Sequence, residues 1–152
     1  MQKVNVEIMP SFSNITYGIL IAVAGLILPA LLIPLVKFAG YSEIFEEIAK
    51  ALVILFLIFK LPTHKAQILA AGAFGFLFGL SENIFYLTNV FALGDFNIFW
   101  QRFLLTVPMH IITVLVMVFA GLARKYLLIL GLVGAVVLHI LFNGIIIDFL
   151  MR

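Results

Sequence analysis

The chain has 152 residues, of which 65% are hydrophobic and 11% charged, and its mean hydropathy is +1.28. This composition excludes a soluble globular domain and predicts an integral membrane protein. A helix that crosses ~30 Å of hydrocarbon takes about 20 residues, so there is room for about five spans and no separate soluble domain. The net charge of +2 comes from cations spread over helix ends, which excludes a nucleic-acid partner, and the absence of cysteine excludes disulfides and thiolate chemistry.

Five apolar segments follow one another along the chain and predict an all-α, polytopic membrane bundle that forms one domain, residues 1–152. The predicted spans are about 15–36, 43–61, 66–93, 102–123 and 126–149. Pro29 and Pro34 interrupt the first segment where a signal peptide would have a small-residue cleavage site, which favours a membrane anchor. Pro62 stops the second span, and the connection before the fourth holds Trp100 as an interfacial aromatic residue.

The third span is unusual because Glu82 is its only charged residue. A charged side chain near the bilayer centre costs roughly 2.5 to 3.5 kcal/mol on insertion scales, so such residues usually face a bundle interior or a water-filled cavity. Ala71, Gly75 and Gly79 recur at every fourth position of the same span. We expect this small-residue stripe to bring the preceding helix close to Glu82.

Polar side chains of the other spans fall at a similar depth. With ~1.5 Å of rise per residue, Glu82 lies ~17 Å and His110 ~15 Å from the helix ends on the same side of the membrane. The remaining members occupy the second and fifth spans: Glu46, Glu47, His139 and Asn143. Buried polar groups need partners, so we expect all six to line one polar cavity. The other cations lie at or near span ends, where we expect solvated or snorkelling charges: Lys37, Lys60, Lys65, Arg102, Arg124, Lys125 and Arg152.

These polar residues occur in a characteristic order: Glu46-Glu47-Ile-Ala-Lys50, Phe78-Gly-Leu-Ser-Glu82-Asn83, His110, and His139-Ile-Leu-Phe-Asn143. The pattern resembles the PrsW family of membrane-embedded glutamic-type proteases, a branch of the group that contains the CAAX prenyl endopeptidases and bacteriocin-processing enzymes. The resemblance covers Glu46 to Asn143 and leaves the first span outside. It implies an endopeptidase whose site lies inside a helical bundle and uses the glutamates of the first motif and the later histidines. CAAX relatives usually have His at the place of Glu82.

Carboxylate, imidazole and amide groups can together supply the activated water, the oxyanion stabiliser and the proton donor that peptide hydrolysis needs. We hypothesise that Glu46 or Glu47 is the general base and that Glu82 shares its proton or orients the water. His139 and Asn143 would then bind the oxyanion, with His110 as proton donor or further stabiliser. Two residues would support the site: Lys50, which neutralises Glu46 or Glu47, and Asn83. Ser81 points ~100° away from Glu82 and is interpreted as a helix-helix hydrogen bond.

Two alternatives stay open. In a zinc-dependent version of the protease the metal ligands would be Glu82, His110 and His139, whereas the first version needs no cofactor. The helical HExxH motif is absent, and Asn143 takes the place of a second helical histidine. The other alternative is a proton-coupled transporter or channel, because intramembrane Glu and His chains also serve as proton relays. A catalytically idle assembly protein would keep the same cluster only as structure.

The distribution of cations predicts the orientation. With a cytoplasmic N-terminus, Lys3, Lys60, Lys65, Arg124 and Lys125 lie inside, against Lys37, Arg102 and Arg152 outside. We therefore expect a multi-pass protein of a prokaryotic cell membrane whose site opens toward the extracytoplasmic face. The expected partners are the lipid bilayer and a membrane protein or peptide substrate such as an anti-sigma factor. The chain is shorter than typical relatives, which makes a homo-oligomer plausible.

Overall fold

The computed structural model describes residues 12–93 and 96–150, with side chains described for 14–87, 96–97 and 99–145. The described residues form five α-helices and a single 3-10 turn, with no strand among them. The elements are α1 (Phe12–Ala39), α2 (Ser42–Lys60), α3 (His64–Leu93), α4 (Phe96–Ala123), η1 (Lys125–Leu127) and α5 (Leu128–Leu150). The predicted all-α class and the five predicted helices are confirmed.

Four of the helices are long and apolar enough to cross a membrane: Asn14–Ala39, His64–Leu87, Phe99–Ala123 and Lys125–Ile145. These make the chain a multi-pass membrane protein. Helix α2 falls outside this set because its 19 residues include Glu43, Glu46, Glu47, Lys50 and Lys60. Helix α2 is therefore the most highly charged of the five helices, and it contacts all four of the others.

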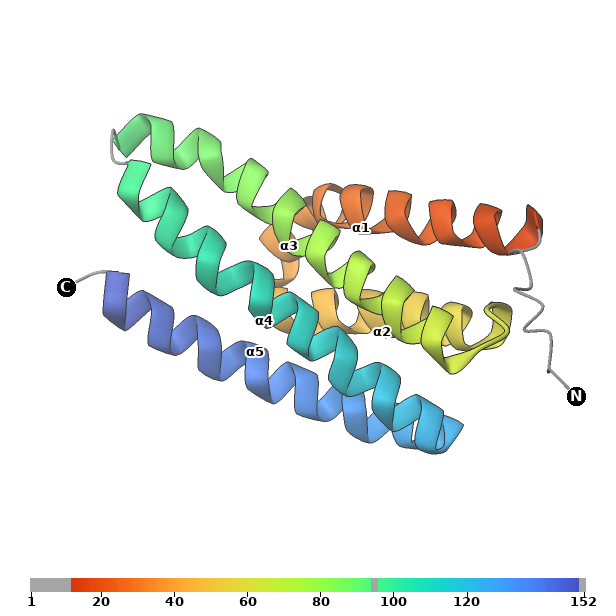
Figure 1. Ribbon diagram of the computed structural model, residues 1–152. Helices are drawn as coiled ribbons and strands as arrows, with labels where there is room; N and C mark the ends of the chain where they lie inside the picture. The colour runs from red at the N-terminus through yellow and green to blue at the C-terminus, as the bar shows by residue number, and fades with distance from the viewer. Residues whose placement is uncertain (1–11, 94–95, 151–152) are drawn as a thin grey trace, which may run out of the picture.

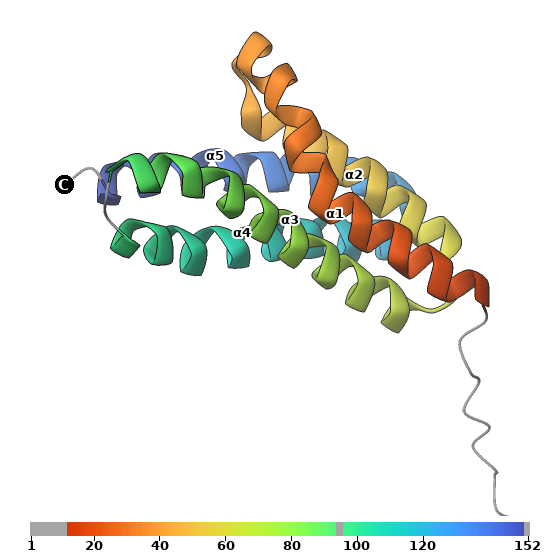
Figure 2. The ribbon, with the colours of Figure 1, turned by 90° about the horizontal axis from the view of Figure 1, so that it is seen from above.

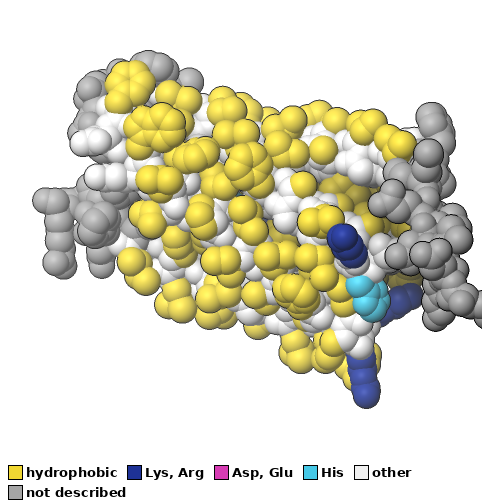
Figure 3. Space-filling model, in the orientation of Figure 1, with side chains coloured by type: hydrophobic (Ala, Val, Ile, Leu, Met, Phe, Trp, Pro, Cys, Tyr) yellow, Lys and Arg dark blue, Asp and Glu magenta, His cyan; other side chains and the backbone are white. Residues whose placement is uncertain are grey.

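The bundle buries one face of α2, the face that carries Glu47 and Lys50. Helices α3, α4 and α5 lie side by side, and α1 and α2 lie behind them (Figures 1 and 2). The face seen in Figure 3 carries hydrophobic side chains across its middle, with Lys, Arg and His gathered at one end. An apolar band of this kind is what a lipid environment requires, so the charged groups of α2 must find their partners inside the bundle.

Two helix boundaries differ from the predictions. Helix α4 begins at Phe96, so residues 96–101, expected in a connection, are helical because neither Gly nor Pro interrupts them. Trp100 lies on this first part of α4, exposed, with its ring 5.3 Å from that of Phe99. Helix α1 continues through both of its prolines and ends before Gly40, whose positive φ of 76° suits the residue that follows a helix.

The small-residue stripe of α3 packs against α4. A Cβ atom added to Gly75 would lie 2.8 Å from the His110 carbonyl oxygen, and one added to Gly79 would lie 2.9 Å from His110 Cδ2. The prediction that this stripe draws in the preceding helix was therefore wrong, since α3 makes its close approach to α4 and not to α2. Glu82 lies three residues beyond Gly79 on a similar face of α3, so the same contact brings it to His110.

Candidate active site

A buried lysine is at the centre of the polar cluster. Lys50 Nζ donates to Glu47 Oε1 at 2.7 Å and lies 2.6 Å from His110 Nδ1. The ammonium also lies over the Phe78 ring, 4.4 Å from its centroid. An ammonium has three N–H donors and no acceptor, so Glu47, His110 and the aromatic face account for all three. Lys50 and Glu47 are both 0% exposed. Lys50 was predicted to neutralise Glu46 or Glu47, and in the structure it forms its ion pair with Glu47.

The cluster extends from this lysine to two further helices. His110 Nε2 contacts Glu82 Oε2 on α3, and His139 Nδ1 on α5 lies 2.8 Å from Glu47 Oε1. The two histidine rings stand edge to face with centroids 5.3 Å apart. The contacts thus run Glu82, His110, Lys50, Glu47, His139 and join helices α2, α3, α4 and α5.

The hydrogen-bond partners assign the histidine tautomers. Because the Lys50 ammonium can only donate, His110 accepts at Nδ1 and carries its proton on Nε2, which donates to Glu82. His139 donates from Nδ1 to Glu47, so its Nε2 is the unprotonated nitrogen of the neutral ring. The same carboxylate therefore holds both Lys50 and His139 in place.

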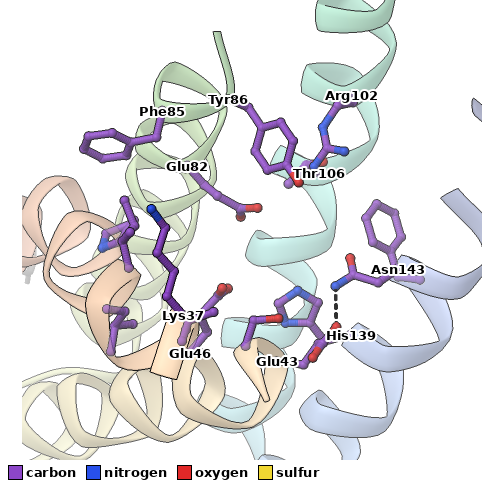
Figure 4. Close-up of a pocket in the computed structure, with 16 residues that line it drawn as sticks. Lys37, Glu43, Glu46, Glu82, Phe85, Tyr86, Arg102, Thr106, His139 and Asn143 are labelled. Atoms are coloured by element: carbon purple, nitrogen blue, oxygen red, sulfur yellow. Dashed lines mark hydrogen bonds between the residues drawn. The ribbon is translucent and has the colours of Figure 1, made fainter. Parts of the chain in front are cut away.

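A cavity of about 670 Å³ opens beside the cluster. Glu46 and Glu43 of α2, Glu82 of α3, and His139 and Asn143 of α5 all line it (Figure 4). Its wall also includes two cations, Lys37 and Arg102. The polar groups of all five helices thus share one space that is large enough for several residues of a peptide.

Glu46 and Glu47 have different environments although they are neighbours in sequence. Glu46 lines the cavity, and its Oε2 is buried without a hydrogen-bond partner in the described part of the protein. Glu47 is fully buried behind the cavity wall, where its Oε1 binds Lys50 and His139. Consecutive helical residues point ~100° apart, so one reaches the cavity and the other reaches the ion cluster.

The structure brings six of the predicted residues into this cluster or onto the cavity beside it: Glu46, Glu47, Lys50, Glu82, His110 and His139. Asn143 lines the same cavity, but its Nδ2 donates to Glu43 Oε1 at 2.8 Å.

The remaining predicted residues lie apart from the cluster. Asn83 turns away, since its Nδ2 donates to the Gly79 carbonyl of its own helix at 2.8 Å. Ser81 donates to the Leu26 carbonyl of α1 at 2.7 Å, as its interpretation as a helix-helix hydrogen bond predicted.

Sequence reasoning missed several polar residues of the cavity wall, among them Glu43 and Arg102. Glu43 precedes Glu46 by three and Glu47 by four positions, a helical spacing that could have revealed it. Arg102 was expected to be a solvated span end; instead its guanidinium carbon lies 3.7 Å from the Tyr86 ring centroid and the residue lines the cavity. The signal was its position eight residues before His110, which places both on one face of α4.

Comparison with known proteins identifies the family. A family model described as PrsW family intramembrane metalloprotease matches residues 15–151. The chain belongs to the PrsW family. It is therefore an intramembrane peptidase, and the match includes α1, which the sequence motifs had left outside the resemblance. Searches of curated proteins and of solved structures found no match.

The family description raises the question of a metal. Among the described residues, Glu46, His110 and His139 each offer one ligand atom, all within 4.8 Å of one another. One Glu and two His form a known zinc donor set, and the unpartnered Glu46 oxygen suits it, so the residues fit the ion. This group differs from the predicted one, since Glu46 stands in place of Glu82.

The surroundings of the two histidines differ in how well they suit a metal. A metal-bound histidine normally donates its second N–H to an acceptor, as His139 does to Glu47. His110 instead has the Lys50 donor at Nδ1 and Glu82 at Nε2. Binding of zinc would therefore require His110 to release one of these partners.

Proposed function

We propose that this peptidase hydrolyses a peptide bond of a membrane protein or membrane-inserted peptide with a water molecule activated by Glu46. The observation that carries the proposal is the Glu46 carboxylate oxygen, which is buried beside the cavity and has no partner in the described part of the chain. A general base must be within hydrogen-bond reach of the proton that it abstracts. Glu47 Oε2 also has no partner in the described part of the chain, but of the two adjacent glutamates Glu46 is the one that lines the cavity where a substrate can lie.

His139 is the proposed proton carrier for the leaving amine. Its Nδ1 donates to Glu47, and the residue lines the cavity. A buried carboxylate on one imidazole nitrogen orients the ring and stabilises the imidazolium that forms when the other nitrogen takes a proton. Glu47 thus acts through His139 as a positioning residue, which is consistent with its burial away from the cavity.

Two more groups complete the proposal. Asn143 uses one of its two N–H donors on Glu43, so the other is available for the oxyanion. Glu82 lines the cavity and orients the water or shares its proton with Glu46, while His110, fully buried, holds Glu82 through Nε2. His110 is therefore assigned a positioning role in place of the proton donor inferred from sequence.

A zinc-dependent version is the second candidate because the family description names a metalloprotease. Glu46, His110 and His139 would hold the ion, which when bound supplies Lewis acidity and lowers the pKa of a water ligand. The present partners of His110 favour the version without metal. Metal analysis of active, chelator-washed protein distinguishes the two: stoichiometric zinc lost together with activity would establish the metal version.

Cleavage of a single-span membrane substrate by glutamine variants tests the base. We expect Glu46→Gln to lower kcat by roughly 10²- to 10⁴-fold, the usual contribution of a general base. Glu43→Gln is the comparison variant, because it removes a carboxylate of the same helix and cavity while the glutamine oxygen can still accept from Asn143, and we expect a much smaller loss. Cleavage by Glu46→Gln at the wild-type rate would rule out the proposed base.

A further inference from the structure

Helix α4 carries a row of polar residues that the proposed mechanism uses only in part. Arg102, Thr106 and His110 are spaced by four residues, so they lie on one face of the helix. Arg102 and Thr106 both line the cavity, with Tyr86 of α3 beside them (Figure 4). The row runs from the buried His110 toward the first turns of α4.

Two groups of this row lack hydrogen-bond partners. Arg102 Nε and Thr106 Oγ1 are both buried, and neither has a partner in the described part of the chain. Thr113, on the same helix, shows the usual alternative, since its hydroxyl donates to the His110 carbonyl at 3.2 Å. Two neighbouring buried donors without acceptors indicate a place where a ligand supplies the acceptor.

The charge and orientation of the arginine specify that ligand further. The Arg102 guanidinium lies over the Tyr86 ring, with 3.7 Å from its carbon to the ring centroid. This contact holds the group in place and leaves its N–H edge available for a planar acceptor. Among residues with described side chains, no carboxylate forms an ion pair with Arg102; Glu82 and Glu43 are engaged by His110 and Asn143 instead.

We propose that Arg102 and Thr106 form a carboxylate-binding subsite for the substrate peptide. This proposal rests on the proposed function. A guanidinium edge matches a carboxylate in a bidentate geometry, and a hydroxyl one turn away adds a third donor. The carboxylate belongs either to an acidic side chain or to the carboxyl terminus of the substrate. Thr106 and Arg102 lie four and eight positions from His110, ~6 and ~12 Å along the helix.

Binding of three matched peptides to the cleavage-deficient Glu46→Gln protein tests the subsite without relying on catalysis. The peptides are apolar heptamers: one with central Asp and an amidated end, one with central Asn and an amidated end, and one with central Asn and a free carboxyl terminus. Calorimetry in a neutral detergent is expected to show one carboxylate peptide binding on the order of 10- to 100-fold more tightly than the neutral peptide. Which of the two does so identifies the source of the carboxylate.

Substitutions of Arg102, and of Arg124 as a second arginine that contacts a tyrosine, test whether the preference depends on the subsite. Arg102→Met should abolish the carboxylate preference, and Arg102→Lys should retain part of it. Arg124→Met is the matched control, because Arg124 also contacts a tyrosine, Tyr126, but at the exposed α4–α5 turn. It should leave the preference unchanged.

Three outcomes would overturn the subsite. These are equal binding of all three peptides, a preference that survives Arg102→Met, and a preference of the Glu46→Gln protein that disappears when phosphatidylglycerol is added, which would assign the site to a lipid phosphate. Failure of the base would appear separately, as wild-type cleavage by Glu46→Gln, so the two proposals fail in different experiments.

Discussion

Replacement of Lys50 by methionine is the sharpest test of how the cluster is held together. The ammonium is 2.7 Å from Glu47 Oε1 and 2.6 Å from His110 Nδ1, and Lys50 and Glu47 are both 0% exposed. Methionine keeps most of the length of the side chain but leaves the carboxylate with His139 as its remaining partner. Breaking a buried ion pair by removing one member typically costs about 3–5 kcal/mol, because the other charge stays buried and uncompensated.

Reversible unfolding in mixtures of a neutral detergent and dodecyl sulfate, followed by circular dichroism, measures this loss. Lys60→Met is the control, since Lys60 lies on the same helix but is exposed, 5.9 Å from the Tyr17 ring centroid, and should change stability by less than about 1 kcal/mol. Adding Glu47→Gln to Lys50→Met should recover part of the loss, because the uncompensated charge is then gone. If Lys50→Met unfolds no more easily than Lys60→Met, the buried pair does not stabilise the bundle.

Three further predictions concern helix packing and orientation. Gly75→Ala should destabilise the protein by about 1–3 kcal/mol, because its Cβ would lie 2.8 Å from the His110 carbonyl oxygen, whereas Gly72→Ala, with nothing within 4 Å, should be neutral or stabilising in the same unfolding assay. Ser81→Ala should cost about 1 kcal/mol through loss of the hydrogen bond to Leu26 on α1; an unchanged unfolding midpoint would contradict that role. The chain has no cysteine, so single Cys substitutions of Lys37 and Lys65 can be labelled in intact cells, and we expect only the first to react from outside.

Much of the fold could be predicted because the relevant forces are local. Helices α2 and α3 are separated at Pro62, as expected from its effect on the backbone, and apolar length predicted the remaining spans. The convergence of Glu47, Glu82, His110 and His139 was predictable too. Depth in a membrane follows directly from position along a helix, and polar groups at one depth must find one another in an apolar surrounding.

The rotation of each helix about its axis was not predictable from the same information. Helices α3 and α5 are apolar on nearly every side, so no pattern in the sequence indicates which face meets a neighbour. The glycine stripe could equally have faced α2, and only the packed bundle shows that it faces α4 at His110. The rotation of α4 about its axis likewise brings Arg102 into the cavity wall, although its position at a span end predicted a solvated charge.

The sequence by itself determined the class of the protein, its helices, its family and the set of polar residues at one depth. The tertiary structure decided which of two adjacent glutamates faces the cavity: Glu46 does, and Glu47 holds Lys50 and His139. The physical reason is the ~100° turn between consecutive helical residues. A difference of one position changes nothing in depth or composition, yet it separates a carboxylate beside the substrate from one buried in an ion pair.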